Sequence, residues 1–299
     1  MTDVSIIIVN YNTLKMTSEC IDSVIEKTGG ISYEIILVDN ASSDGSKDFF
    51  SNDCRVKYIY NDENLGFGRA NNKGLEIAQG RNVLFLNSDT LLKNNAIKIL
   101  SDYLDNNEKV GACGGNLYNR EGQPEFSFGR YFPSLYEELN FISNGKLDRL
   151  RFGENINFNH TTKPLEVAFV SGADLMVKKV VLNVTGWFDK KFFLYYEDTE
   201  LCFRINKRKF KLVSVPDAQI AHFWGETTGH LNEKNFCRTE QSRRIFYQLS
   251  YSRFYSSIVE VIRSVHLYRK LLSPFPDTRK RWKRRKEMLN KINTGGNEE

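Results

Sequence analysis

The sequence predicts an α/β fold with a mostly parallel central sheet flanked by helices and followed by a helical C-terminal extension. Short apolar, β-branched runs such as 4–9 are typical of strands buried on both faces. Segments with apolar residues three and four positions apart separate these runs, and this alternation indicates parallel strands joined by right-handed crossovers. Each run ends in polar, turn-forming residues, so we expect the functional site beyond the carboxyl ends of the strands.

The alternation is clearest in the first hundred residues. We expect four strands there, over Val4–Val9, Glu34–Val38, Val56–Tyr60 and Val83–Leu86. We expect the intervening helices over 14–27, 47–52, 67–79 and 94–106. In the first of these helices Ile21, Val24 and Ile25 fall on one face, which is the spacing of an amphipathic helix.

The second half of the chain is less regular. Asn, Gly, Phe and Arg dominate between about 115 and 165, where we expect long loops. Ordered structure is expected to return over 166–178, with a helix at 197–209, two short strands at 211–215 and 219–223, and helices from about 235. The sequence thus predicts an α/β domain over residues 1–230 and a helical, basic extension over residues 231–299.

Composition excludes several classes of protein. Of the 299 residues, 40% are hydrophobic and 26% are charged, which is ordinary for a globular protein. No uncharged apolar run approaches the roughly 20 residues needed to span a bilayer. We expect no signal peptide at the N-terminus, because Asp3 lies where such a peptide carries basic residues. The five cysteines are scattered without a CxxC pair, so we expect reduced thiols, no zinc site and a cytoplasmic protein.

Positive charge gathers near the C-terminus. Residues 269–291 hold ten Lys and Arg against two acidic residues, while the rest of the chain carries a net charge of −3. Such a segment suits an anionic surface, and a solvated helix face is the simpler interpretation. Together with the apolar stripe of the helix over 258–272, it predicts peripheral attachment to the inner face of the cell membrane, and the same stripe allows a homodimer.

Acidic residues stand at three structurally related positions. Asp39 ends the second strand, Asp89 follows the fourth, and Glu197-Asp198 begins a helix. Carboxylates at the same edge of a sheet can converge on one cleft. Each is also explained by turn formation or helix capping, so no single position decides the function.

The order of several motifs along the chain decides it. The motifs are VSIIIVNYN at 4–12, VDNASSDGS at 38–46, NLGFG through NNKG at 64–74, FLNSD at 85–89, and GWFD through FLYYED at 186–198. Together they resemble family 2 glycosyltransferases of the GT-A fold, especially the rhamnosyltransferase-like branch, and the resemblance covers about residues 3–230. It implies an inverting, metal-dependent transfer of a sugar from a nucleoside diphosphate, UDP or dTDP, with dTDP-rhamnose as the branch-level donor and UDP-galactose or UDP-glucose as alternatives.

The resemblance also assigns a nucleotide pocket. Asp39 matches the carboxylate that accepts a hydrogen bond from the imide N–H of a pyrimidine ring. Tyr11 and Asn12 match positions that line the pocket. Gly66 and Asn72 match the loop and helix start on either side of the nucleoside, where a glycine lets the backbone approach the ligand closely.

Asn87-Ser88-Asp89 stands in the place of the family's DxD motif, with Asn at its first position. The resemblance implies that Asp89 binds Mg²⁺ or Mn²⁺ directly, while Asn87 acts by hydrogen bonding or through water. A hard cation there neutralises the leaving diphosphate. His222 matches a histidine that completes the metal site in many members, although a lone histidine is often structural.

Glu197-Asp198 matches the motif that supplies the catalytic base. We assign Asp198 as the base that accepts the proton of the acceptor hydroxyl, and Glu197 as the residue that orients it. Both can alternatively serve only to favour a helix N-terminus. Gly172 matches a stretch near the acceptor, where its small size admits a sugar; a glycine required for packing or for a turn is an equal alternative.

Two other function classes compete with a transferase. A non-catalytic nucleotide-sugar or carbohydrate-binding module of the same fold would bind a donor without turning it over, and the acidic pairs argue against it. Nucleic acid is not expected as a partner, because the body lacks basic patches interleaved with aromatic residues. The expected partners are therefore a nucleotide-sugar donor and a saccharide or lipid-linked saccharide acceptor from cell-surface polysaccharide synthesis.

Overall fold

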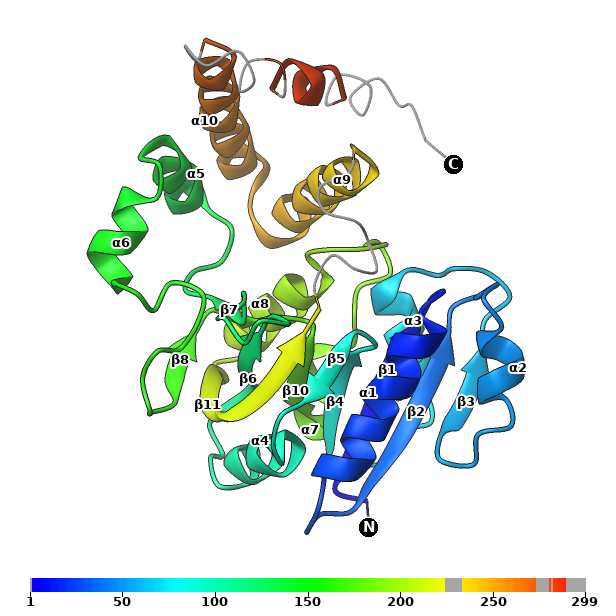
Figure 1. Cartoon of the computed structure of the whole chain (residues 1–299). Helices are drawn as coiled ribbons and strands as arrows, with labels where there is room; N and C mark the ends of the chain where they lie inside the picture. The colour runs from blue at the N-terminus through cyan, green and yellow to red at the C-terminus, as the bar shows by residue number, and fades with distance from the viewer. Residues whose placement is uncertain (1, 224–232, 273–279, 281, 289–299) are drawn as a thin grey trace.

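The computed structural model describes residues 2–223, 233–272, 280 and 282–288. Within these residues nine strands form a mixed sheet in the order β3-β2-β1-β4-β10-β6-β11-β5, with β8 paired to β11. A separate two-stranded ribbon pairs β7 with β9. Helices lie on both faces of the sheet, and two C-terminal helices lie beyond one edge (Figure 1).

The N-terminal half follows the predicted alternation. Its elements are β1 (Val4–Asn10), α1 (Leu14–Lys27), β2 (Tyr33–Asp39), α2 (Ser46–Phe50), β3 (Lys57–Tyr60), α3 (Phe67–Leu75), β4 (Asn82–Asn87), β5 (Thr90–Leu92) and α4 (Ala96–Asp105). Strands β1, β2, β3 and β4 pair in parallel. The short strand β5 was not expected, and α3 ends four residues before the prediction.

The second half contains more structure than expected. Its elements are β6 (Val110–Tyr118), β7 (Phe128–Gly129), α5 (Leu135–Ile142), α6 (Lys146–Phe152), β8 (Leu165–Val167), β9 (Phe169–Val170), β10 (Asp174–Lys178), α7 (Lys179–Thr185), α8 (Glu197–Lys207), β11 (Lys211–His222), α9 (Glu233–Ser250) and α10 (Arg253–Leu271). The expectation of long loops over 115–165 is wrong where α5 and α6 lie. The two strands expected at 211–215 and 219–223 are one strand, β11, with a register shift between Ser214 and Gln219.

Alternating side chains of the strands build two separate cores. Ile6 and Ile8 of β1 face α1 and α4, whereas Ile7 faces the opposite side, where α3, α7 and α8 pack. All three isoleucines are fully buried. Burial on both faces explains why β1 reads as an unbroken apolar run, and it confirms the predicted class of fold.

Three strands depart from the parallel pattern: β5 and β8, which pair antiparallel with β11, and β10. Strand β10 runs antiparallel to both of its neighbours, β4 and β6. Its insertion brings the turn 171–173 beside the carboxyl end of β4, where the Asn87 N–H donates to the Ala173 carbonyl over 3.0 Å. The turn thereby reaches the edge of the sheet where the functional site was expected.

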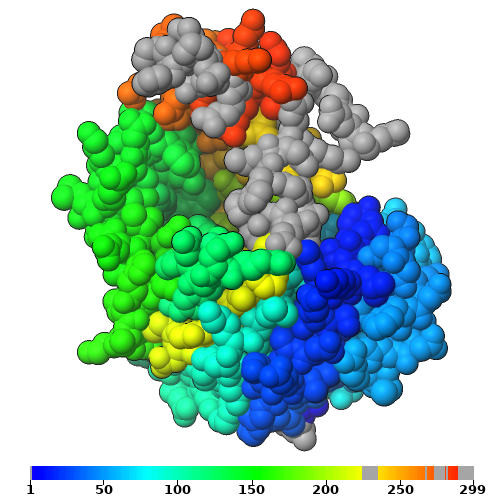
Figure 2. Space-filling model, in the orientation of Figure 1, coloured from blue at the N-terminus to red at the C-terminus, as the bar shows by residue number. Residues whose placement is uncertain are grey.

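The C-terminal helices pack on the body of the protein. Phe246 of α9 and Val259 of α10 are fully buried in a third core that also contains Phe192. Buried ion pairs add to it, because Arg263 of α10 contacts Glu138 of α5 and Glu240 of α9. Figure 2 shows the orange C-terminal helices resting on the green segment that contains α5. The predicted domain boundary at 230 falls outside the described residues.

Among the described helices, none combines the length and the apolar character that crossing a bilayer requires.

Candidate active site

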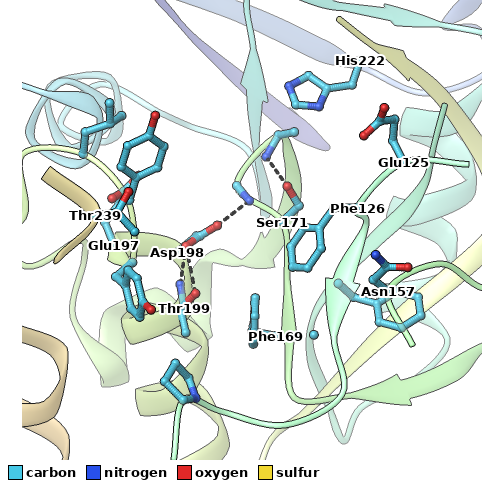
Figure 3. Close-up of a pocket in the computed structure, with 18 of the residues that line it drawn as sticks. Glu125, Phe126, Asn157, Phe169, Ser171, Glu197, Asp198, Thr199, His222 and Thr239 are labelled. Atoms are coloured by element: carbon cyan, nitrogen blue, oxygen red, sulfur yellow. Dashed lines mark hydrogen bonds between the residues drawn. The ribbon is translucent and has the colours of Figure 1, made fainter. Parts of the chain in front are cut away.

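A cavity of about 740 Å³ opens at the carboxyl edge of the sheet. Its lining includes the end of β4, the turn before β10, the start of α8, the end of β11 and the segments 125–133 and 156–157, with further residues from α9 (Figure 3). Asn87, Asp89, Glu197, Asp198 and His222 all line it. The structure therefore brings together residues that are more than a hundred positions apart.

Three polar side chains form a cluster at one end of the cavity. Nε2 of His222, at the end of β11, lies 3.4 Å from Oδ1 of Asp89 and 3.3 Å from Nδ2 of Asn87. Asp89 and His222 are 5% and 6% exposed, so these contacts are screened from bulk water. With the Asn87 amide as donor, Nε2 accepts, and its lone pair lies beside a carboxylate oxygen.

This donor set fits a divalent cation. A carboxylate oxygen and a neutral imidazole nitrogen are ligands for Mn²⁺, and the Asn87 amide would have to release Nε2 for it to bind the cation. Mg²⁺ in nucleotide sites is held by only one or two carboxylates plus substrate oxygens and water. The described residues contain no group of three or more His, Cys, Asp or Glu that could hold a metal alone. A site built on Asp89 and His222 therefore needs ligand oxygens to complete it.

The Asp198 carboxylate is held from two sides. Its Oδ2 accepts a hydrogen bond of 2.8 Å from the Gly172 N–H, and its Oδ1 accepts one of 2.6 Å from the Thr199 N–H. Burial raises the pKa of Asp198, and these backbone hydrogen bonds act in the opposite direction. A Cβ on Gly172 would lie 3.2 Å from Oδ2, so the glycine allows this close approach. The carboxylate is fixed, desolvated and more basic than one in water.

Glu197 differs from its neighbour in environment. Burial, followed by the nearby Asp198 carboxylate, raises the pKa of Glu197 to about 8. Its Oε2 is buried and has no hydrogen-bond partner among the described residues. Tyr195 and Tyr196, immediately before it, both have positive φ angles, of 71° and 66°. Such backbone conformations in non-glycine residues persist only where the surroundings enforce them, and they occur often at functional sites.

Asp39 is not among the residues that line this cavity. It is fully buried at the end of β2, where Oδ1 accepts from the Ser42 N–H over 2.8 Å and Oδ2 accepts from the Tyr58 hydroxyl over 3.1 Å. The expected convergence of three carboxylates on one cleft thus holds for Asp89 and Asp198 and not for Asp39.

A chain of hydrogen bonds nevertheless connects the ends of β1, β2 and β4. Asn10 Nδ2 donates to Asp39 over 3.4 Å, and the Thr13 hydroxyl donates to Asn10 Oδ1 over 2.7 Å. The same hydroxyl lies 3.2 Å from Ser88 Oγ, in the middle of the NSD motif. Asn10 and Thr13 were not predicted as site residues, and their position at the end of β1 and three residues beyond it is the signal that identifies them.

Two predicted residues lie in the turn after β1. The Tyr11 side chain is 49% exposed, and it is not part of the cavity. Asn12 has a positive φ of 55°, and its Oδ1 accepts from the Ser43 N–H over 2.7 Å. Asn12 therefore ties this turn to the loop that follows Asp39.

Gly66 and Asn72 hold the segment that leads to Glu197. A Cβ on Gly66 would lie 2.2 Å from the Phe193 carbonyl oxygen. Asn72 uses both ends of its amide on Phe188: Nδ2 donates to the carbonyl over 2.9 Å and Oδ1 accepts from the N–H over 3.1 Å. The close approach that requires glycine at position 66 is thus made by the chain itself, whereas we expected a ligand there.

Asp174 is a buried carboxyl that the sequence analysis left unassigned. Burial raises its pKa to about 7, although the Gly115 N–H and His222 act in the opposite direction. Its Oδ2 accepts from the Gly115 N–H over 2.5 Å. Its place two residues after Gly172, at the start of β10, is the sequence feature that would have marked it.

Comparison with known proteins gives a consistent result. The family model "Glycosyl transferase family 2" matches residues 5–165. The chain is 27% identical over 216 residues to the low-salt glycan biosynthesis hexosyltransferase Agl10 of Haloferax volcanii, covering 71% of this chain and 64% of that protein. It is 27% identical over 224 residues to the dTDP-rhamnosyl transferase RfbF of Shigella flexneri, covering 74% of this chain and 69% of that protein.

Solved structures share the fold. The structure of GalNAc-T7 with UDP, GalNAc and Mn²⁺ superimposes with a TM-score of 0.59 at 16% identity, over 89% of this chain and 54% of the other. Residues 1–349 of S. aureus TarS superimpose with a TM-score of 0.52 at 16% identity, over 83% of this chain and 73% of the other. The architecture is the expected GT-A fold. Because the family model matches more than half of the chain, the chain belongs to glycosyl transferase family 2.

Proposed function

We propose that the protein is an inverting, metal-dependent transferase that moves a sugar from a nucleoside diphosphate to a saccharide or lipid-linked saccharide in glycan synthesis. The observation that carries this proposal is the shared cavity, which places the Asp89–His222 pair and the partly buried Asp198 carboxylate on one hollow. The names of the Shigella and Haloferax relatives, a dTDP-rhamnosyl transferase and a hexosyltransferase of glycan biosynthesis, support the same class of reaction.

Asp198 acts as the base in this proposal. The acceptor hydroxyl gives its proton to Asp198 while its oxygen forms a bond to the anomeric carbon, and the bond from that carbon to the diphosphate oxygen breaks on the opposite face. Attack opposite to the leaving group inverts the configuration at that carbon. The hydrogen bonds from Gly172 and Thr199 hold the carboxylate in place, so the proton transfer needs little reorganisation.

Glu197 stays protonated near neutral pH, since its pKa is raised to about 8. A neutral acid beside Asp198 avoids a second buried negative charge and keeps a hydrogen-bond donor in the cavity. Glu197 therefore orients the base or the acceptor, and Asp198 takes the proton.

Asp89 and His222 are the residues that would hold Mg²⁺ or Mn²⁺. When bound, the cation supplies charge neutralisation for the leaving diphosphate. Asn87 lies beside His222 Nε2 and would act there by hydrogen bonding or through water once the cation is bound. The nucleotide side keeps its predicted residues Tyr11, Asn12, Asp39 and Ser88, and the Asn10–Thr13–Ser88 hydrogen bonds link that side to Asp89. Gly66 and Asn72 act on the site through the segment that they anchor at Phe188 and Phe193.

A thermal-shift screen tests this function. UDP, dTDP and their sugars, dTDP-rhamnose first, should raise the melting temperature more with MnCl₂ than without it, since a ligand at a hundredfold excess over its Kd stabilises by about 2.7 kcal/mol. The stabilising sugar nucleotide should then be consumed with release of the nucleoside diphosphate. Stabilisation without turnover favours the non-catalytic binding module, and no stabilisation by any of them contradicts the proposal.

We also propose that α10 rests on an anionic membrane surface. Several apolar side chains at helical spacing are exposed along it: Phe254, Val261, Val265, Tyr268 and Leu272. Arg269 and Lys270 lie beside this stripe, and the charge complements an acidic lipid surface.

The double variant Val261→Glu, Val265→Glu should no longer sediment with phosphatidylglycerol-containing vesicles. The wild-type protein should sediment with these vesicles and not with vesicles of pure phosphatidylcholine. Equal sedimentation of the variant contradicts the proposal. A concentration-dependent dimer that the two substitutions dissociate would instead identify the stripe as a contact between two copies.

A further inference from the structure

Two phenylalanine rings lie inside the cavity. Phe126 is 47% exposed although it lines the hollow, and Phe169 is partly buried beside it, with ring centroids 6.1 Å apart. Figure 3 shows both rings around the same hollow as Asp198. Exposed aromatic surface in a concave site is costly in water, at about 25 cal/mol per Å², and therefore marks a surface that a ligand covers.

The backbone on both sides of Phe126 is fixed. The Glu125 N–H donates to the Leu117 carbonyl over 2.9 Å, and the Ser127 N–H donates to the Asn157 carbonyl over 2.8 Å. Phe126 is thus presented by a short segment that is hydrogen-bonded at either end. Such a segment keeps the ring exposed, because the backbone cannot rotate it into the core.

Phe169 is fixed by its own neighbours. Besides its contact with Phe126, the Phe169 ring stacks on Phe132, with ring centroids 6.3 Å apart. A Cβ on Gly129 would lie 2.1 Å from Cε1 of Phe169, so only glycine at position 129 leaves room for the ring. The chain therefore holds two rings in the hollow, one exposed and one supporting it.

The surroundings of these rings indicate the ligand. Glu125 and Asn157 border the hollow beside Phe126, and Asp198 lies in the same hollow, held by the turn only three residues after Phe169 (Figure 3). A pyranose ring has an apolar face of C–H groups and a rim of hydroxyls, which matches an aromatic surface edged by polar side chains. Asn87, Asp89 and His222 line the same hollow.

We propose that Phe126 and Phe169 form the platform on which the acceptor's pyranose ring stacks, so that one of its hydroxyls meets Asp198. The inference rests on the proposed function and deepens it, because it makes the acceptor a pyranoside and names residues that position it. Glu125 and Asn157 then take the hydroxyls along the ring edge. The platform acts on acceptor binding and leaves donor binding unaffected.

Binding and turnover are measured separately to test the platform. A panel of methyl hexopyranosides is screened by saturation-transfer NMR on wild-type protein with UDP and MnCl₂, and the best binder is then used as acceptor with the donor found by thermal shift. Phe126→Ala should weaken its binding and raise the acceptor KM about three- to tenfold, the range that one aromatic pair supplies, with donor KM unchanged. Phe126→Trp should restore binding, whereas Phe126→Leu should not.

Two further variants separate the platform from general effects. Phe49→Ala is the matched control, because Phe49 is 50% exposed with one phenylalanine neighbour and lies outside the cavity. It should leave glycoside binding unchanged. Gly129→Ala should reproduce the loss seen in Phe126→Ala by displacing the Phe169 ring, and unfolding by urea reports its stability.

The outcomes distinguish this inference from the proposed function. Glycoside binding that depends on Phe126 in a protein without turnover supports the platform and contradicts the transferase. Turnover with an acceptor KM that Phe126→Ala leaves unchanged overturns the platform and leaves the transferase intact. Absence of binding by every glycoside in the panel also overturns the platform.

Discussion

Replacing Gly66 by alanine tests how the segment before Glu197 is anchored. Gly66 has φ of 80° and ψ of 171°, a region that only glycine adopts readily, and its Cβ would lie 2.2 Å from the Phe193 carbonyl oxygen. The backbone strain costs about 1–3 kcal/mol, and the collision adds about 1–3 kcal/mol. We therefore expect the free energy of unfolding to fall by about 2–6 kcal/mol, a large part of a typical stability of about 5–15 kcal/mol.

Gly186 supplies a matched control within the same segment. Its φ of 82° and ψ of 170° are nearly the same, but its nearest contact for a Cβ is the end of the flexible Arg204 side chain, at 3.3 Å. Gly186→Ala should therefore show the strain alone, about 1–3 kcal/mol. Urea unfolding followed by tryptophan fluorescence measures both. Equal losses in the two variants would refute the contact between Gly66 and Phe193.

Three further predictions concern the pH dependence of stability, metal binding and the ion pairs between α5, α9 and α10. The pKa values of Glu197 and Asp174 are raised to about 8 and 7, so the native protein keeps these protons at pH values at which the unfolded chain has lost them. The free energy of unfolding should therefore fall as pH rises from about 4.5 to 8. Thermal melts should show a flatter slope in Glu197→Gln and Asp174→Asn, and an unchanged slope in both contradicts the burial of these protons. Asp89→Ala and His222→Ala should each weaken Mn²⁺ binding with UDP at least tenfold by calorimetry, and unaltered affinity removes them from the cation site. Arg263→Met should lower stability by about 3–5 kcal/mol because it leaves Glu138 buried without its cation and leaves Glu240 with Arg243 alone, whereas the exposed Arg253→Met should have little effect.

The sequence predicted the strands that carry continuous apolar residues and missed those that do not. Strand β6 was not predicted because Gly111, Gly114 and Gly115 make its sequence resemble that of a turn. The structure explains each glycine, since a Cβ would lie 2.8 Å from Phe210, 2.2 Å from Val170 and 2.4 Å from the Ala218 carbonyl oxygen, respectively. Close packing against neighbours far along the chain is invisible in local periodicity.

The candidate site shows the same division. Asp89 and Asp198 were predictable because each stands at the end of a strand or the start of a helix, and the sheet brings those points together. The partners of Gly66 and Asn72 were not, because both residues bind a segment more than a hundred positions away. Phe126 was missed because an exposed aromatic residue in an irregular region has no spacing to mark it.

The central claim is that the Asp198 carboxylate removes the acceptor proton in the cavity it shares with Asp89. Single-turnover transfer by Asp198→Asn, beside wild-type protein and with the same donor, acceptor and MnCl₂, tests it most directly. The account predicts a rate lower by about 10²–10⁴-fold with donor affinity and melting temperature retained. Transfer at the wild-type rate would contradict it.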